Sequence, residues 1–127
     1  MSKVEAGYFY TKNHEWAKIE GDLVRVGISD YAQDALSDIV YVELPAPGDH
    51  FEGDMALGVV ESVKSASDVY TPVAGTVEMV NEALLESPET INVEPYGAGW
   101  LVLLKPDGPL EDLMDAHAYE AFLETLH

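Results

Sequence analysis

Short apolar runs separated by Gly, Pro, Asp and Asn turns dominate the chain and predict a series of β-strands. No parallel strand–helix–strand rhythm is visible, which argues against a nucleotide-binding fold. The pattern therefore predicts a mainly β fold, a flattened barrel or β-sandwich. The expected strands lie at residues 8–11, 17–20, 23–28, 39–44, 55–60, 69–73, 76–80 and 100–104.

Three short helices are expected between and after these strands. Ser29 is a suitable N-cap for the first, with Asp30 in its opening turn. Residues 81–86 can cap and begin the second, and residues 87–99, rich in Pro and Gly, predict a loop. Residues 109–125 carry apolar side chains at helical spacing, which predicts a C-terminal helix that packs on the core.

The most informative stretch joins the strands at residues 55–60 and 69–73 and is centred on Lys64. Gly53 and Gly75 lie equally far before and after this lysine. Such symmetric punctuation predicts a β-hairpin over about residues 55–75 with Lys64 at its tip. Because no Asn-Gly or Gly-X pair is present, a type I turn is expected.

The register of this hairpin is open. With Lys64-Ser65 at the centre of the turn, Glu61 would face Asp68, and directly opposed like charges destabilise a strand pair. With Val63 and Lys64 at the centre, this opposition disappears. In either register the ammonium group points into water.

Composition narrows the function. The 127 residues are enough for one domain with a real core, and they hold 24 acidic against six basic residues, a net charge of −18. Such a surface repels nucleic acid and anionic membranes and suits docking on basic patches of proteins. The chain has no cysteine, so any thiol chemistry must come from a cofactor. No signal peptide or membrane-length apolar run is evident, so a soluble protein in a reducing compartment is expected.

The side chains offer little for catalysis by the polypeptide itself. The four histidines lack a metal-binding spacing. Glu61, Asp68 and Glu15 could be paired for acid–base chemistry, but residues beside an exposed hairpin tip have no evident pocket to separate their pKa values. We therefore expect no catalytic residue and no metal site, and interpret the chain as a non-catalytic protein.

The sequence around Lys64 resembles the attachment motif of the lipoyl and biotinyl carrier domains, and within them the H-protein family of the glycine cleavage system. The matching residues are 61–64, 66–68 and the turn at 72–75. Biotin carriers usually have Met on both sides of the lysine, whereas Val63 and Ser65 flank it here.

Similarity to the H-protein family extends over nearly the whole chain. It continues in residues 14–16, 27–33, 38–45, 80–84 and 95–101. The resemblance implies one lipoyl-carrier domain over residues 1–127, of the barrel-sandwich hybrid type, with a short helix in the N-terminal half and a C-terminal helix. Some members carry His where Ala35 stands here, so details of arm docking that depend on that imidazole do not carry over.

The resemblance also implies a cofactor site. Lipoic acid would be joined to Lys64 by an amide bond, which removes the ammonium charge. Glu61 and Asp68 would serve recognition and local positioning of the arm. Glu15 and Asn13, with Trp16 beside them, would line a surface that shelters the loaded arm, although a Trp is more often part of the core.

The partners that the resemblance implies are enzymes. A pyridoxal-phosphate-dependent glycine decarboxylase would load an aminomethyl group, and a tetrahydrofolate-dependent aminomethyltransferase would remove it. The flavoprotein dihydrolipoamide dehydrogenase, with FAD, would restore the disulfide, and a lipoyl ligase or transferase would attach the arm. We expect a monomer without nucleic-acid or membrane partners, in the cytoplasm or, for a mature eukaryotic form, in the mitochondrial matrix.

Three other functions are weighed. A lipoyl domain of a 2-oxoacid dehydrogenase complex is disfavoured because no linker or catalytic domain is present. A lipoyl-relay protein that donates its cofactor to other carriers uses the same modified lysine, so the sequence does not separate it from the main interpretation. An unmodified β-sandwich adaptor is disfavoured by the symmetric setting of Lys64.

Overall fold

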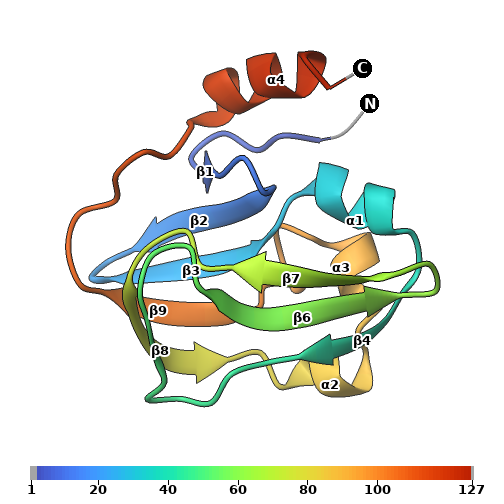
Figure 1. The fold of residues 1–127 in the computed structure, drawn as a ribbon, viewed down its shortest axis with the longest axis horizontal. Coiled ribbons are helices and arrows are strands. Elements are labelled where there is room, and N and C mark those ends of the chain that lie inside the picture. The colour runs from blue at the N-terminus through green and yellow to red at the C-terminus, as the bar shows by residue number, and fades with distance from the viewer. Residues whose placement is uncertain (1–2, 127) are drawn as a thin grey trace.

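Two antiparallel sheets face each other in the computed structural model, which describes residues 3–126 (Figure 1). This confirms the mainly β, flattened barrel-sandwich fold that the sequence predicts. The six-stranded sheet has the order β1 (Phe9–Tyr10), β2 (Glu15–Glu20), β3 (Leu23–Ile28), β9 (Val102–Pro106), β8 (Gly75–Val80) and β5 (His50–Phe51). The three-stranded sheet has the order β4 (Ile39–Glu43), β6 (Ala56–Ser62) and β7 (Ala66–Tyr70).

Among residues 3–126, four short helices lie outside the sheets: α1 (Asp30–Leu36), α2 (Ala83–Glu86), α3 (Thr90–Val93) and α4 (Ala116–Glu124). The predicted cap of α1 is confirmed, because Ser29 Oγ accepts a hydrogen bond from the Ala32 amide at 3.2 Å. Within residues 3–126 no helix has the length and apolar character needed to cross a membrane.

The main core lies between the two sheets, because alternate residues of each strand point inward. Fully burying one such aliphatic side chain stabilises the fold by about 1.5–3 kcal/mol. The alternation of apolar and polar residues in the sequence thus indicates the side chains that hold the two sheets together. The buried members of this core include Val24, Val26, Ile39, Val42, Leu57, Val60, Val69, Val77, Val102 and Leu104.

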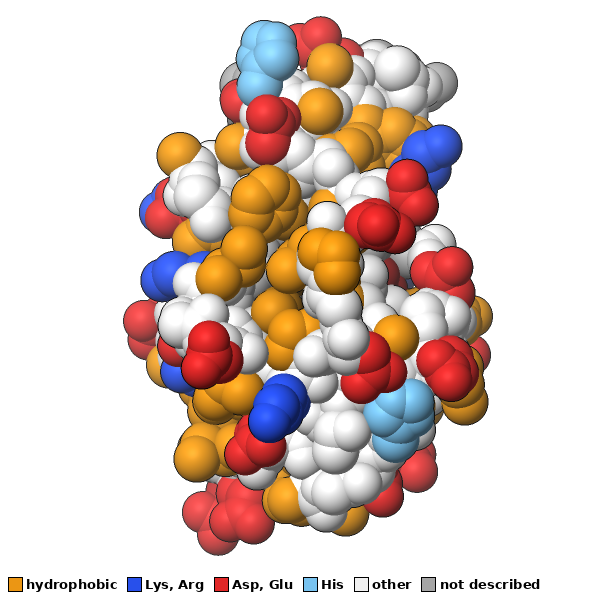
Figure 2. Space-filling model, turned by 90° about the vertical axis from the view of Figure 1, so that its left-hand side faces the viewer, with side chains coloured by type: hydrophobic (Ala, Val, Ile, Leu, Met, Phe, Trp, Pro, Cys, Tyr) orange, Lys and Arg blue, Asp and Glu red, His pale blue; other side chains and the backbone are white. Residues whose placement is uncertain are grey.

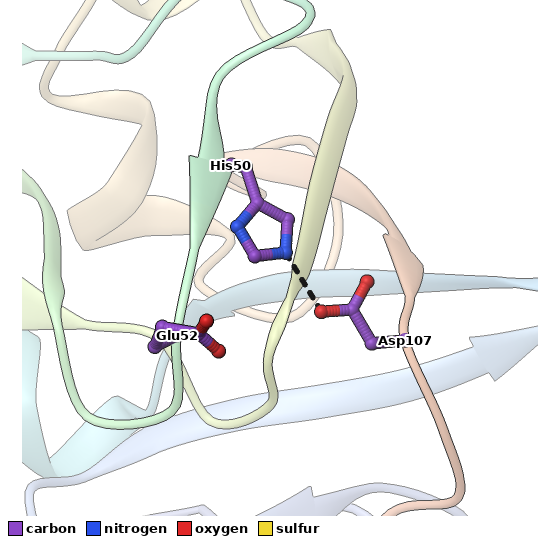
Figure 3. Close-up of side chains that lie close together, drawn as sticks. All are labelled: His50, Glu52 and Asp107. Carbon is purple, nitrogen blue, oxygen red and sulfur yellow. Dashed lines mark hydrogen bonds and ion pairs between the residues drawn. The ribbon is translucent and has the colours of Figure 1, made fainter.

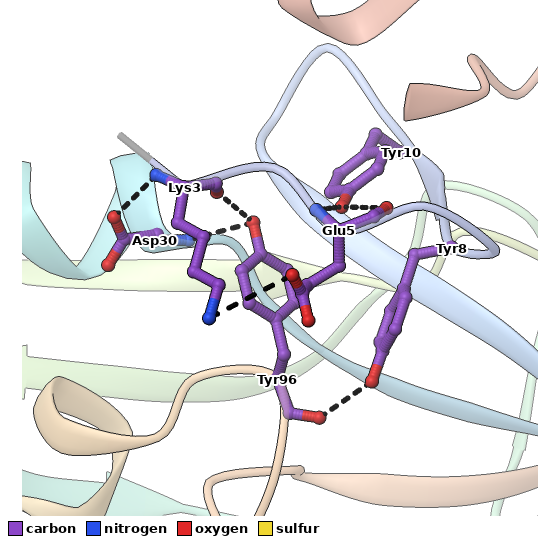
Figure 4. Close-up of polar contacts among 6 residues, drawn as sticks. All are labelled: Lys3, Glu5, Tyr8, Tyr10, Asp30 and Tyr96. Atoms are coloured by element: carbon purple, nitrogen blue, oxygen red, sulfur yellow. Dashed lines mark hydrogen bonds and ion pairs between the residues drawn. The ribbon is translucent and has the colours of Figure 1, made fainter. Parts of the chain in front are cut away.

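A second, aromatic cluster holds the chain ends against the outside of the six-stranded sheet. Tyr10, Trp16 and Tyr119 are fully buried in it, and the rings of Tyr10 and Tyr119 stack at 4.2 Å. Trp16 is therefore a core residue. In Figure 4 the hydroxyl of Tyr96 donates to the Lys3 carbonyl oxygen at 2.7 Å, which fastens the N-terminal segment beside this cluster.

The C-terminal helix is shorter than predicted. It begins at Ala116 rather than at residue 109, with the carboxylate of Asp115 accepting from the Ala118 amide at 2.8 Å. The preceding segment is irregular rather than helical, and in it Met114 exchanges two backbone hydrogen bonds with Tyr10, at 2.7 and 2.9 Å. A helix over this segment would forfeit that pairing.

Smaller departures concern other boundaries. The loop expected at residues 87–99 contains α3. The predicted strand at 100–104 begins at Val102, and the second strand of the central hairpin spans Ala66–Tyr70 rather than 69–73. The other predicted strands and the α2 helix are found with shifts of a few residues.

Candidate lysine-attachment site

The β6–β7 hairpin ends in a tight turn that carries Lys64. The Ser62 amide donates to the Ser65 carbonyl oxygen at 2.7 Å, so Val63 and Lys64 are the two central residues. Glu61 is paired with Ala66, so it does not face Asp68. The structure thus selects the register that avoids opposed carboxylates.

The turn geometry follows from its backbone angles and from one serine. Neither Val63 nor Lys64 has a positive φ, which excludes types I′, II and II′ and is compatible with the expected type I turn. Ser62 Oγ accepts hydrogen bonds from the amides of Lys64 and Ser65, both at 3.1 Å, and donates to the Ser65 carbonyl oxygen at 3.2 Å. The side chain of Ser62 therefore holds the turn that presents the lysine.

The tip rests on the connection between α1 and β4. The Val63 amide donates to the carbonyl oxygen of Asp38 at 3.0 Å, and Lys64 Nζ donates to that of Ala35 at 3.3 Å. Ala35 belongs to the last turn of α1, where carbonyl oxygens lack helical partners and attract cations. Figure 1 shows the tip beside this connection, at the right-hand end of the molecule.

Lys64 is exposed, and its nitrogen forms no ion pair with the residues that the structure describes. The ion pairs found among residues 3–126 are Lys3–Glu5, Arg25–Glu20 and His50–Asp107. A hydrogen bond to a neutral carbonyl is thus the polar contact of Nζ. An amine in this setting is accessible to an acylating enzyme.

Glu61 and Asp68 lie on the outer face of the hairpin. Glu61 is paired with Ala66, and Asp68 is paired with Val59, so the two acids are diagonal neighbours about 7–8 Å apart. Glu61 is half-buried beside Tyr41 of the adjacent strand, whereas Asp68 is exposed. Two carboxylates therefore stand on the strands that lead to Lys64.

Glu15 lies near the base of the hairpin and is buried, with 2% of its surface exposed. Its carboxylate accepts from the Thr11 hydroxyl at 2.6 Å and from the Tyr70 amide at 3.2 Å. Burial raises the pKa of this carboxyl group, and the two hydrogen bonds oppose that rise. The expectation that Glu15 lines an open surface is therefore wrong. Instead, the Glu15 carboxylate fixes the end of β7 to the six-stranded sheet.

Asn13 is exposed and lines a groove of about 680 Å³ beyond the hairpin base. Figure 2 shows this end of the molecule, where hydrophobic side chains gather in the middle and acidic side chains lie around them. Residues 53–54, 72–74 and 107–114 supply the other walls. Because residues 53–54 and 72–74 flank the base of the hairpin, Asn13 lies at the end of the hairpin opposite Lys64.

One histidine meets two acids, which its spacing in the sequence did not predict. His50, Glu52 and Asp107 bring ligand atoms to within 4.8 Å of one another (Figure 3). His50 Nε2 lies 2.7 Å from Asp107 Oδ2, and this hydrogen bond raises the pKa of the imidazole. Because all three residues are exposed, we interpret the group as a surface ion pair with a neighbouring acid and assign no metal to it.

Sequence reasoning missed two residues that hold the tip. Ser62 belongs to the motif around Lys64 but was not identified as the residue that shapes the turn, although a serine at the start of a turn is a known local signal for side-chain-to-backbone hydrogen bonds. Asp38, whose carbonyl oxygen accepts from the Val63 amide, was not singled out either. Its role depends on a contact between distant segments and has no local signal.

A flattened barrel-sandwich with an exposed lysine at a stiff hairpin tip is the arrangement of proteins that carry a cofactor on a lysine side chain. The sequence comparisons are more specific. The model of the family described as glycine cleavage H-protein matches residues 8–126, and the chain belongs to this family.

Curated relatives and a solved structure agree with this membership. The chain is 58% identical to the glycine cleavage system H protein of a Thermus thermophilus strain over 119 residues, which cover 92% of this chain and 93% of the relative. It is 52% identical to that of Halothermothrix orenii over 125 residues, covering 97% and 98%. The crystal structure of a glycine cleavage system H protein from Mycobacterium marinum superimposes with a TM-score of 0.90 at 38% identity, covering 95% of this chain and 99% of that one.

Proposed function

We propose that the chain is a single-domain lipoyl carrier of the glycine cleavage system, with lipoic acid attached through an amide bond to Lys64. The observation that carries the proposal is the exposed lysine nitrogen, ordered by one hydrogen bond at the tip of a braced hairpin. Membership of the H-protein family supports it.

The surroundings of Lys64 fit an amide-linked group. Acylation converts the ammonium into a neutral amide that keeps one N–H, and this N–H can still donate to the Ala35 carbonyl oxygen. No ion pair is lost, because no carboxylate is paired with Nζ within residues 3–126. Bound lipoic acid supplies the disulfide chemistry that a chain without cysteine lacks.

The partner steps complete the proposal. A pyridoxal-phosphate-dependent glycine decarboxylase passes an aminomethyl group to the carrier, and a tetrahydrofolate-dependent aminomethyltransferase takes it. FAD-containing dihydrolipoamide dehydrogenase then restores the disulfide, and a lipoyl ligase or transferase attaches the arm. The net charge of −18 favours basic docking patches on these enzymes. The chain itself is a non-catalytic monomer, and its relatives in bacteria lead us to propose the cytoplasm as its location.

The flanking residues have smaller proposed roles. Glu61 and Asp68 share the outer face of the two strands that end at Lys64, which suits recognition by the attaching enzyme and positioning of the arm. Asn13 lines the groove at the hairpin base, at the opposite end of the hairpin from Lys64, so we assign it no contact with the loaded arm. Glu15 contributes indirectly, because its carboxylate holds the Tyr70 amide at that base.

The attachment site is tested by intact-mass measurement after incubation with lipoate, ATP and a lipoate ligase. The wild-type chain should gain one lipoyl group, and Lys64→Arg, which keeps the charge, should gain none. Lys12→Arg is the matched control, because it changes another exposed lysine and should leave the mass gain intact. Lipoylation of the Lys64→Arg chain would show that the site is elsewhere.

The carrier function needs a second assay. Glycine–bicarbonate exchange with the decarboxylase should require the lipoylated chain and should fall to background with Lys64→Arg. Full exchange with unmodified protein would refute a role for the arm. Transfer of lipoate from this chain to another carrier domain, measured in parallel, separates a relay function from aminomethyl transport.

A further inference from the structure

The segment that receives the hairpin tip is itself held by a distant side chain. The carbonyl oxygens of Ala35 and Asp38 accept from Lys64 Nζ and the Val63 amide. Between them lies Ser37, whose φ of 71° places it in a region that residues other than Gly rarely adopt. A backbone conformation of this kind persists only where its surroundings hold it.

Asn92, in the short helix α3, provides that hold. Its Oδ1 accepts from the Ile39 amide at 2.9 Å, and its Nδ2 donates to the Ser37 carbonyl oxygen at 2.8 Å. The same Nδ2 donates to Oε1 of Gln33 at 2.9 Å. One amide group thus bonds α1, the connection after α1, and the first residue of β4.

We propose that Asn92 is a positioning residue for the modification of Lys64. By holding residues 37–39, it places the Asp38 carbonyl oxygen where the Val63 amide meets it and so fixes the turn that carries the lysine. Asn92 does not touch Lys64 and acts through this connection. The inference rests on the proposed function, because it concerns a lysine that is modified.

The chemistry of the amide explains why this residue type is needed. The site demands one acceptor for the Ile39 amide and two donors for the oxygens of Ser37 and Gln33. Asparagine supplies both in one planar group. Aspartate has the same shape but only acceptors, so Asn92→Asp keeps the bond to Ile39 and sets a carboxylate oxygen against the Ser37 carbonyl.

Asn81 provides a matched control. Its Nδ2 also donates to two carbonyl oxygens, those of Ala98 and Trp100, both at 2.8 Å. These acceptors lie in the segment before β9, and within residues 3–126 that segment has no backbone hydrogen bond to the hairpin tip. Asn81→Asp should therefore destabilise the fold in a comparable way without moving Lys64.

The test combines amide hydrogen exchange with lipoylation kinetics. In Asn92→Asp the Val63 amide should exchange about tenfold faster relative to the core amide of Val60, because a neighbouring hydrogen bond loses its support. The kcat/KM for lipoylation by a lipoate ligase, with lipoate and ATP saturating, should fall about fivefold or more. Asn81→Asp should change neither quantity by more than about twofold.

Each other outcome has a definite meaning. Unchanged Val63 exchange in Asn92→Asp, or equal effects in Asn81→Asp, would overturn the positioning role. If the Val63 amide exchanged faster in Asn92→Asp while the kcat/KM for lipoylation did not change, the positioning role would also be overturned, because a loosened tip would then be modified as well as an ordered one. A wild-type chain that accepts no lipoate at Lys64 would refute the proposed function, while the exchange rate of Val63 would still decide whether Asn92 orders the tip.

Discussion

Replacing Ser62 with alanine should loosen the hairpin tip while leaving the core intact. The lost side chain accepts hydrogen bonds from the amides of Lys64 and Ser65, both at 3.1 Å. A hydrogen bond contributes about 0.5–1.5 kcal/mol net, and water competes for bonds at the surface, so two of them stabilise the closed tip by about 1 kcal/mol. Because about 1.4 kcal/mol corresponds to a factor of ten, the open tip should become about fivefold more populated.

Amide hydrogen exchange measures this opening directly. In Ser62→Ala the amides of Lys64 and Ser65 should exchange about fivefold faster, whereas the core amide of Val60 should not change. Ser67→Ala is the matched control, since within residues 3–126 the hydroxyl of this serine in the same hairpin makes a single long hydrogen bond, 3.5 Å to the Asp68 carbonyl oxygen. Unchanged exchange in Ser62→Ala, or the same acceleration in Ser67→Ala, would refute the assignment of the turn's order to Ser62.

Two further predictions concern stability. Gly58→Ala should lower the free energy of unfolding by about 1–3 kcal/mol, because a Cβ there would lie 2.5 Å from the Glu43 carbonyl oxygen. Gly53→Ala, where a Cβ meets nothing within 4 Å, is its control in thermal denaturation, and equal losses would contradict the steric reason. Burial lowers the pKa of His14 in the folded chain. As the pH falls, the imidazole of His14 is therefore protonated in the unfolded chain before it is protonated in the folded chain, and the free energy of unfolding decreases. His14→Asn, which tolerates the positive φ of 69°, should lose less stability between about pH 7 and about pH 5 in urea unfolding; parallel pH profiles would exclude His14 as the source.

The central hairpin could be predicted because its signals are local. Glycines equally far before and after Lys64 bracket the hairpin, and the repulsion between Glu61 and Asp68 favours one of two registers. Both effects act between residues that are close in the sequence. The Ser29 cap of α1 could be predicted for the same reason, because a serine directly before a segment with helical apolar spacing is a local signal for a helix start.

The start of the last helix could not be predicted from periodicity. Leu110 and Leu113 fall at helical spacing and pack against the main core, as the stripe suggested. Their segment is nevertheless not helical, and Met114 at its end pairs with Tyr10, more than a hundred positions away in the chain. Helix propensity is a weak preference that such tertiary pairing overrides.

The contacts that hold the segment beside the hairpin tip could not be predicted either, because they also join residues that are far apart in the sequence. Asn92 reaches Ser37 and Ile39 from a segment that the abundance of Pro and Gly marks as a loop. The resemblance placed Glu15 at a surface that shelters the arm, yet hydrogen bonds from Thr11 and Tyr70 satisfy its carboxylate inside the fold. Both the contacts of Asn92 and the burial of Glu15 thus depend on hydrogen bonds to residues that are distant in the sequence.

The setting of Lys64 fits the acylation that we propose for it, even in a strongly acidic chain. In a chain with a net charge of −18, an exposed lysine can pair with a carboxylate, as Lys3 does with Glu5, and such an ion pair would oppose loss of the positive charge. Here the turn register leaves Glu61 and Asp68 on the outer face, and the nitrogen meets the neutral carbonyl of Ala35. An amide N–H can make the same contact, so the unmodified tip already has a geometry that the acylated lysine can keep.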